Sequence, residues 1–230
     1  MIFPSHWFGP GAKLDSALQS RVAAWKALPP TTPQETFAGI RWVVADTETG
    51  GLDVRRDRLI AIGAVTLAGL RIPMADAFDV VLRQAMPSSR ENIVVHGIGG
   101  AAQRSGEDAP AALIRFLEYC GKSPLIAYHA PFDAAFVKRA MREHLDFDPH
   151  LAWLDLAALL PVLFDGPAHA PLDHWLDRFG IAASARHTAL GDAFATAQLA
   201  QIIFRRAQAR GTWNYRGLAS MAANRRWVGH

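Results

Sequence analysis

Apolar positions recur along the chain at spacings that predict helices and strands separated by glycine- and proline-rich segments. In residues 15–28, apolar side chains lie three or four positions apart, as in an amphipathic helix. The proline-rich stretch at residues 29–33 ends that helix and acts as a stiff connector. We therefore expect residues 1–35 to form an N-terminal helical arm. The favoured arrangement is packing of this arm on the main domain, and the alternative is binding to a partner.

The pattern changes from residue 36, where β-rich runs come first and helical spacing follows. Strands are expected at residues 40–45, 59–67, 77–82 and 123–128. Helices are expected at residues 109–119, 131–143, 154–163, 172–179 and 189–210. The polar segment 54–58 suits a hairpin turn between the first two strands. This order predicts one α/β domain over residues 36–210, a mixed sheet flanked by helices, followed by a tail at residues 211–230.

Composition agrees with one domain and an arm, because the 230 residues are 50% hydrophobic and 20% charged and so can bury a core. A single cysteine excludes a disulfide scaffold and a cysteine-rich zinc site. No apolar run approaches the roughly 18 residues of a membrane helix, and the first residues do not resemble a secretion signal. We therefore expect a soluble, cytoplasmic protein.

Charge is distributed unevenly. The net charge is +3, yet every one of the 21 acidic residues lies at or before Asp192 and six arginines follow it. Residues 1–192 are therefore mildly acidic, and the C-terminal end is basic. This asymmetry suggests a polyanionic partner, although a solvated helix end would have the same composition.

Asp46 and Glu48 end the first apolar strand, just before a glycine pair. Residues two apart on a strand project to the same side, so these carboxylates repel each other unless a cation lies between them. Oxygen ligands of this kind suit Mg²⁺ or Mn²⁺. In the simpler alternative, Asp46 caps a turn and Glu48 points into water.

Two further segments carry acidic residues close to a histidine. Asp133 falls in the first turn of a predicted helix after His129, where it serves either as a cap or as a functional carboxylate. His187 precedes the last long helix, and Asp192 lies in the early turns of that helix. These two residues form either a surface pair or a general base beside a metal-bound carboxylate.

Taken together and in order, the segments D-T-E-T-G-G-L, H-A-P-F-D and H-x-A-x-x-D resemble the DnaQ-like 3′–5′ exonucleases, and within them the DEDDh group. The resemblance covers residues 40 to about 208. It implies a ribonuclease H-like fold, which agrees with the mixed sheet expected from the apolar pattern. The motif surroundings look more like the proofreading epsilon subunit of DNA polymerase III than like the family members that act on RNA.

The resemblance also implies roles for individual residues. Asp46, Glu48 and Asp192 would hold a first metal ion, and Asp46 would bridge to a second. Asp133 would complete the cluster mainly through water, and His187 would be the general base. The implied cofactors are two divalent cations, Mg²⁺ or Mn²⁺.

Substrate contacts follow from the same resemblance. Leu52, His96 and Ile98 match positions that contact the last base and sugar, although Leu52 and Ile98 are equally well explained as ordinary loop hydrophobics. His129 stands where most relatives have an asparagine that helps to hold the substrate end. The expected role of His129 is therefore substrate binding, with an altered nucleotide preference.

The function implied by these motifs is metal-dependent removal of nucleotides from the 3′ ends of single-stranded DNA. One alternative within the same chemistry is an enzyme that trims RNA or degrades oligoribonucleotides. An alternative of another class is an interaction module that keeps the fold and holds a polymerase or sliding clamp. The filled active-site positions favour an enzyme.

Overall fold

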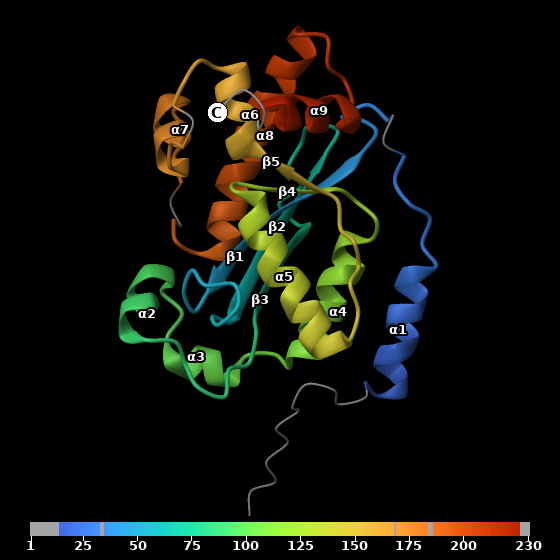
Figure 1. Cartoon of the computed structure of the whole chain (residues 1–230), viewed down its shortest axis with the longest axis vertical. Helices are drawn as coiled ribbons and strands as arrows, with labels where there is room; N and C mark the ends of the chain where they lie inside the picture. The colour runs from blue at the N-terminus through green and yellow to red at the C-terminus, as the bar shows by residue number, and fades with distance from the viewer. Residues whose placement is uncertain (1–13, 33–34, 168, 184–185, 226–230) are drawn as a thin grey trace, which may run out of the picture.

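The computed structural model describes residues 14–32, 35–167, 169–183 and 186–225 (Figure 1). Its strands are β1 (Arg41–Thr49), β2 (Leu59–Ala68), β3 (Ala77–Val81), β4 (Leu125–Ala127) and β5 (Trp153–Asp155). Its helices are α1 (Ser16–Lys26), α2 (Arg90–His96), α3 (Gly100–Ser105), α4 (Ala109–Cys120), α5 (Ala130–Leu145), α6 (Leu156–Leu163), α7 (Leu172–Arg178), α8 (Ala189–Ala209) and α9 (Tyr215–Arg225).

The strands form one five-stranded sheet in the order β3-β2-β1-β4-β5. β1 is the central strand, antiparallel to β2 and parallel to β4. β3 extends the antiparallel side and β5 the parallel side. The predicted mixed sheet and the hairpin between its first two strands are therefore confirmed.

Alternate residues of β1 face two different hydrophobic cores. Trp42 and Val44 belong to a core completed by α6, α7, α8 and α9. Val43 and Ala45 belong to a second core, completed by α1, α4 and α5. Because the central strand is covered on both faces, its residues 42–45 form a continuous apolar run, and its acidic side chains appear only near its C-terminal end.

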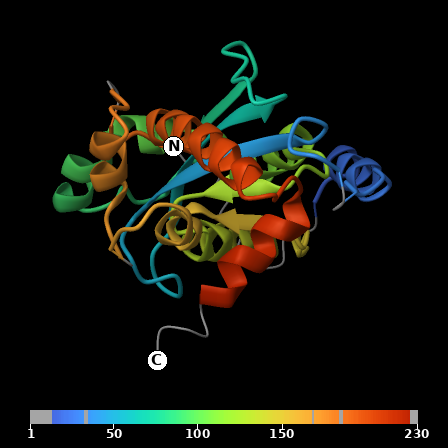
Figure 2. The same cartoon turned by 90° about the horizontal axis from the view of Figure 1, so that it is seen from above.

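Helix α1, within the expected N-terminal arm, lies against α4. Asp15 caps α1 by accepting a hydrogen bond from the Leu18 amide, and Trp25 is buried and donates from Nε1 to the carbonyl of Gly121 at 2.7 Å. Figure 2 shows α1, in blue, at the outer edge of the molecule. None of the described helices is both long and apolar enough to cross a bilayer.

The structure corrects some sequence-based expectations. Residues 154–163 were expected to be helical throughout, but Trp153–Asp155 forms β5 and α6 begins only at Leu156. The short helices α2 and α3 were not predicted. Within the expected C-terminal tail, residues 215–225 form α9, whose Leu218 is buried in the α8-side core. Residues 226–230 of the expected tail lie outside the described residues.

One glycine allows α8 to lie directly on the sheet. Gly63 of β2 is buried and pairs with Asp46 of β1. A Cβ atom at Gly63 would overlap the backbone of Ala189 and Leu190 in the first turn of α8. Since backbone atoms have little freedom to yield, this position requires glycine, and the close approach brings the start of α8 to the acidic end of β1.

We expect Gly63→Ala to destabilise the protein by about 1–3 kcal/mol, because the added methyl group must push α8 away from β2. Urea unfolding followed by circular dichroism measures this change. Gly39→Ala is the matched control, since its Cβ would meet nothing closer than the Thr36 carbonyl at 3.6 Å. Equal stability of the two variants would contradict the proposed role of Gly63.

Candidate active site

The acidic site is built at the C-terminal end of the central strand. Asp46 and Glu48 lie two residues apart in β1, opposite Gly63 and Ala61 of β2. Both carboxylates therefore project from the sheet on the side covered by α8. The Asp46 and Glu48 side chains are partly buried, because the strand that carries them runs through the core.

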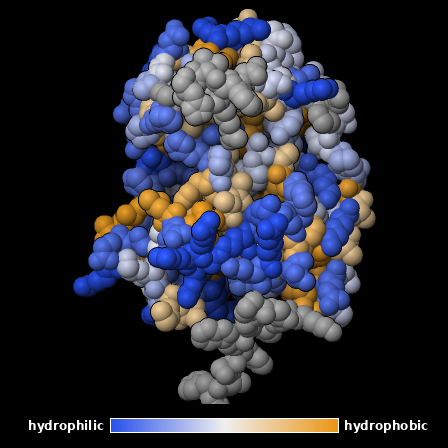
Figure 3. Space-filling view, in the orientation of Figure 1, coloured by the Kyte–Doolittle hydropathy of each residue, from blue (hydrophilic) through white to orange (hydrophobic). Residues whose placement is uncertain are grey.

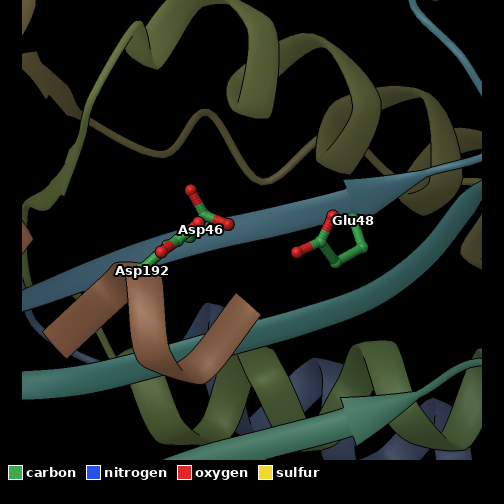
Figure 4. Close-up of side chains that lie close together, drawn as sticks. All are labelled: Asp46, Glu48 and Asp192. Carbon is green, nitrogen blue, oxygen red and sulfur yellow. The ribbon is translucent and has the colours of Figure 1, made fainter. Parts of the chain in front are cut away.

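The first turn of α8 adds a third carboxylate. The Thr188 side chain caps this helix by accepting a hydrogen bond from the Gly191 amide, and Asp192 is buried one turn into the helix. Oxygen atoms of Asp46, Glu48 and Asp192 all lie within 4.8 Å of one another. Figure 4 shows the three side chains gathered between β1 and the start of α8. Three of the predicted site residues are thus brought together.

The electrostatics of this cluster favour a bound cation. Burial raises the pKa of Asp46 well above its usual range, and the negative charges of Asp133, Asp192 and Glu48 raise it further. Burial, followed by the charges of Asp192 and Asp133, raises the pKa of Glu48 to about 7. Oxygen donors alone, close together and mutually repelling, fit a divalent cation that prefers oxygen ligands.

Asp133 belongs to the same acidic region but is held differently. It is buried in the first turn of α5, and its Oδ1 accepts a hydrogen bond of 2.7 Å from the hydroxyl of Thr47, the residue between Asp46 and Glu48. Burial raises the pKa of Asp133 to about 7, although the hydrogen bond from Thr47 opposes the shift. Asp133 thus lies beside the group of three carboxylates and not within it.

Two of the three candidate histidines share a left-handed backbone conformation. His129, at the N-cap of α5, and His187, just before α8, have φ values of 62° and 61°. Both side chains are exposed, and the ring of His129 lies edge-on to Tyr128 at 4.8 Å. His187 is therefore accessible to solvent five residues before Asp192, and His129 is not part of the carboxylate group.

His96 is internal to the α2–α3 segment. Its ring is 2% exposed, Nδ1 accepts a hydrogen bond from the Ile98 amide and Nε2 contacts the Ser88 hydroxyl at 3.1 Å. Gln103 donates to both the Ser88 hydroxyl and the Ile98 carbonyl at 2.8 Å. His96 thus holds the backbone of this loop in place. The Ile98 side chain, in contrast, is half-buried at the surface of the loop.

Three exposed apolar side chains form an apolar rim on the turn that follows β1 and on α2, namely Leu52, Val94 and Val95. The side chain of Leu52 is 84% exposed, and Val94 and Val95 of α2 are 84% and 62% exposed. Asn92 of α2 donates a hydrogen bond to the carbonyl of Gly50, which ties α2 to this turn. The space-filling view shows an apolar patch in the region of α2 (Figure 3).

Sequence reasoning missed several residues that shape the site. Thr47 orients Asp133, Asn92 connects α2 to the glycine turn, and Arg186 forms ion pairs with Asp192 and Asp173. The position of Arg186 next to His187 was the available signal. Asp155 caps α6, because its Oδ1 accepts a hydrogen bond from the Ala157 amide.

These pKa shifts predict how stability depends on pH in the absence of metal. The unfolded chain has carboxyl pKa values of about 4, so the folded protein binds more protons than the unfolded chain between about pH 4 and 7. In EDTA, the free energy of unfolding should fall by on the order of 1–2 kcal/mol between about pH 5 and 8, allowing for solvent screening at Glu48. Urea titrations across this range measure it.

Glu48→Gln should flatten this pH dependence, because it removes one of the groups whose pKa is raised. Asp148→Asn is the control. A hydrogen bond from Lys138 lowers the pKa of Asp148 to about 2, so its contribution to stability changes only below the range tested. Stability that stays constant or rises between these pH values would refute the electrostatic description of the site.

Comparison with known proteins shows the family to which the chain belongs. The sequence matches the exonuclease family over residues 43–200. It is 33% identical over 178 residues to the DNA polymerase III subunit epsilon-like protein of Rhodobacter capsulatus, a match that covers 75% of this chain and 25% of that protein. It is 29% identical over 164 residues to the PolC-type DNA polymerase III of Thermotoga maritima, covering 71% of this chain and 12% of that protein. The chain thus spans a quarter or less of the length of these relatives.

Solved structures share the fold. Escherichia coli exonuclease I, in complex with a dT13 oligonucleotide, superposes with a TM-score of 0.64 at 19% identity and covers 74% of this chain and 42% of its own. The ribonuclease H-like fold expected from the motifs is therefore confirmed. Because the family match takes in β1, α5 and α8 together, the chain belongs to the exonuclease family and carries a DnaQ-like 3′–5′ exonuclease domain.

Proposed function

We propose that this protein removes nucleotides from the 3′ end of single-stranded DNA by phosphodiester hydrolysis with two divalent cations, Mg²⁺ or Mn²⁺. The observation that carries this proposal is the convergence of Asp46, Glu48 and Asp192 within 4.8 Å at the end of β1. The raised pKa values of Asp46 and Glu48 support it, because a cation would relieve the repulsion that causes part of those shifts.

Asp46, Glu48 and Asp192 would hold the first cation, and Asp46 would also reach the second. When bound, two such cations stabilise the attacking and leaving oxygens of an in-line displacement at phosphorus. Asp133 lies beside these ligands, and the Thr47 hydroxyl fixes the orientation of its carboxylate. From that position Asp133 would complete the acidic cluster through water.

His187 would be the general base that accepts a proton from the attacking water. Two features support this role. His187 lies five residues before Asp192, at the entrance to α8, and its exposed ring is able to release the proton to solvent. His129 is a weaker candidate for the base, because its side chain lies at the start of α5 against Tyr128.

The substrate end would lie along the apolar rim. Leu52 projects from the turn after β1, and Ile98 lies on the loop that His96 holds from inside. These side chains would contact the terminal base and sugar. His129, exposed at the start of α5, would also contact the substrate end. Most relatives use asparagine at this position, so the histidine would alter nucleotide preference.

DNA is the favoured polymer, because the relatives above are named as DNA polymerase III proteins and the solved exonuclease I binds a deoxythymidine oligonucleotide. An association with a polymerase is proposed on the same ground. Trimming of RNA is the alternative, since the same carboxylates and histidine would serve it.

The activity is tested with 5′-labelled single-stranded DNA and RNA of matched sequence, in Mg²⁺ and in Mn²⁺. We expect a ladder that shortens from the 3′ end, faster with DNA, and no shortening in EDTA. Asp46→Ala should fold normally and show no detectable activity. His187→Ala should lower kcat by roughly 10²–10⁴-fold, the usual contribution of a general base.

A folded Asp46→Ala variant with near-normal turnover would refute the assignment of the active site. Faster shortening of RNA would support the alternative substrate and leave the chemistry unchanged. Absence of activity on both polymers in every metal tested would overturn the proposal that single-stranded ends are the substrate.

Leu52→Ala should raise KM by roughly tenfold with little change in kcat, because burying a leucine side chain against the substrate contributes about 1.5–3 kcal/mol of binding. Folding should be unaffected, since the Leu52 side chain is 84% exposed. Met74→Ala is the matched control, an equally apolar side chain that is 72% exposed on the segment between β2 and β3. Identical KM values for the two variants would rule out a contact between Leu52 and the substrate.

A further inference from the structure

Arg186 joins two helices through two carboxylates. Its Nη2 lies 2.6 Å from Oδ1 of Asp173 on α7, and its Nη1 forms an ion pair with Oδ1 of Asp192 on α8. The side chain of Arg186 is 20% exposed, whereas that of Asp173 is 57% exposed. The guanidinium group therefore extends from a surface anchor to the edge of the acidic cluster.

The positive charge of Arg186 acts on the whole cluster. It opposes the upward shift in the pKa of both Asp46 and Glu48, so its field reaches the two carboxylates of β1 as well as its direct partner. Arginine keeps its charge at any pH the protein experiences. Any cation that binds to Asp46, Glu48 and Asp192 must therefore do so against this fixed charge.

We propose that Arg186 is a positioning residue that competes with divalent cations for Asp192 and so lowers the affinity of the active site for metal. The proposal rests on the proposed function, which makes Asp192 a metal ligand. The ion pair with Asp173 keeps the guanidinium within reach of Asp192, and Arg186 directly precedes His187.

A purely structural role for Arg186 predicts the opposite result. If the residue served only to brace α7 against α8, its loss would loosen Asp192 and weaken metal binding. Competition predicts tighter binding, because both the repulsion and the occupied carboxylate oxygen are removed. The direction of the change in metal affinity therefore separates the two roles.

The test is calorimetric titration of the full chain with Mn²⁺, without nucleic acid. We expect Arg186→Gln to lower the Mn²⁺ dissociation constant by roughly tenfold, the order of effect of one neighbouring charge. The increase in Tm caused by a fixed Mn²⁺ concentration should grow in parallel, since tighter binding to the folded state adds stability.

Arg178→Gln is the matched control. Arg178 lies on α7 and donates to the carbonyls of Phe164 and Asp165, so its removal deletes one positive charge and a loop contact without removing a partner from the acidic cluster. Its Mn²⁺ affinity should equal that of the wild type.

Asp173→Asn tests the bridge with the charge of Arg186 retained. The guanidinium then loses its charged anchor on α7, and we expect a shift in the same direction as for Arg186→Gln, but smaller. This substitution is at an exposed position, so it keeps the proposal testable if Arg186→Gln fails to fold.

The titration distinguishes failure of the proposed metal site from failure of the proposed role of Arg186. A wild-type protein that binds no Mn²⁺ would overturn the proposed metal site. A wild-type protein that binds Mn²⁺, with unchanged or weaker binding in folded Arg186→Gln, would overturn the role of Arg186 and leave the proposed function intact.

Discussion

The direct approach of α8 to the backbone of β2 at Gly63 is the constraint on which the rest of the site depends. Asp46 and Glu48 belong to the central strand, but Asp192 comes from a helix that is far away in sequence. Only a residue without a side chain lets the first turn of α8 lie close enough to β2 to bring these carboxylates within 4.8 Å. The arrangement of charged groups is therefore a consequence of packing between a helix and a sheet.

This packing has an electrostatic cost. Carboxylates that are partly removed from water and placed beside one another resist ionisation, as the raised pKa values of Asp46, Glu48 and Asp133 indicate. The two hydrophobic cores on either side of β1 hold the strand in place despite this repulsion. Thr47 and Arg186 reduce the cost locally by donating hydrogen bonds to Asp133 and Asp192. Folding and the proposed cation binding would consequently be linked at this site.

Local backbone conformation explains how the second motif departs from the family pattern. His129 adopts the left-handed region at the N-cap of α5, and asparagine and histidine are among the non-glycine residues that are enriched there. Histidine therefore keeps the backbone geometry that brings Asp133 into the first turn of α5. The side chain presented to solvent changes from an amide to an imidazole, so the departure affects surface chemistry and leaves the position of Asp133 unchanged.

The local elements and the order of the motifs could be predicted from sequence patterns alone. Apolar periodicity predicted the hairpin, the mixed sheet and the long helices, because these features depend on neighbouring residues. It missed β5, which is three residues long and too short for a period of its own, and the short helices α2 and α3. The acidic residues were recognisable because their types and spacing reflect chemistry within single segments.

How those segments meet became visible in the folded structure. Asp133, hydrogen-bonded to Thr47, lies apart from the group of three carboxylates. His96 lies inside the loop for which the motif resemblance implied a substrate contact. Arg186 lies between Asp173 and Asp192. These side-chain positions depend on contacts between segments that are distant in sequence. The distances between such segments are set by the packing of α8, α7 and α5 around the sheet, which no local sequence pattern encodes.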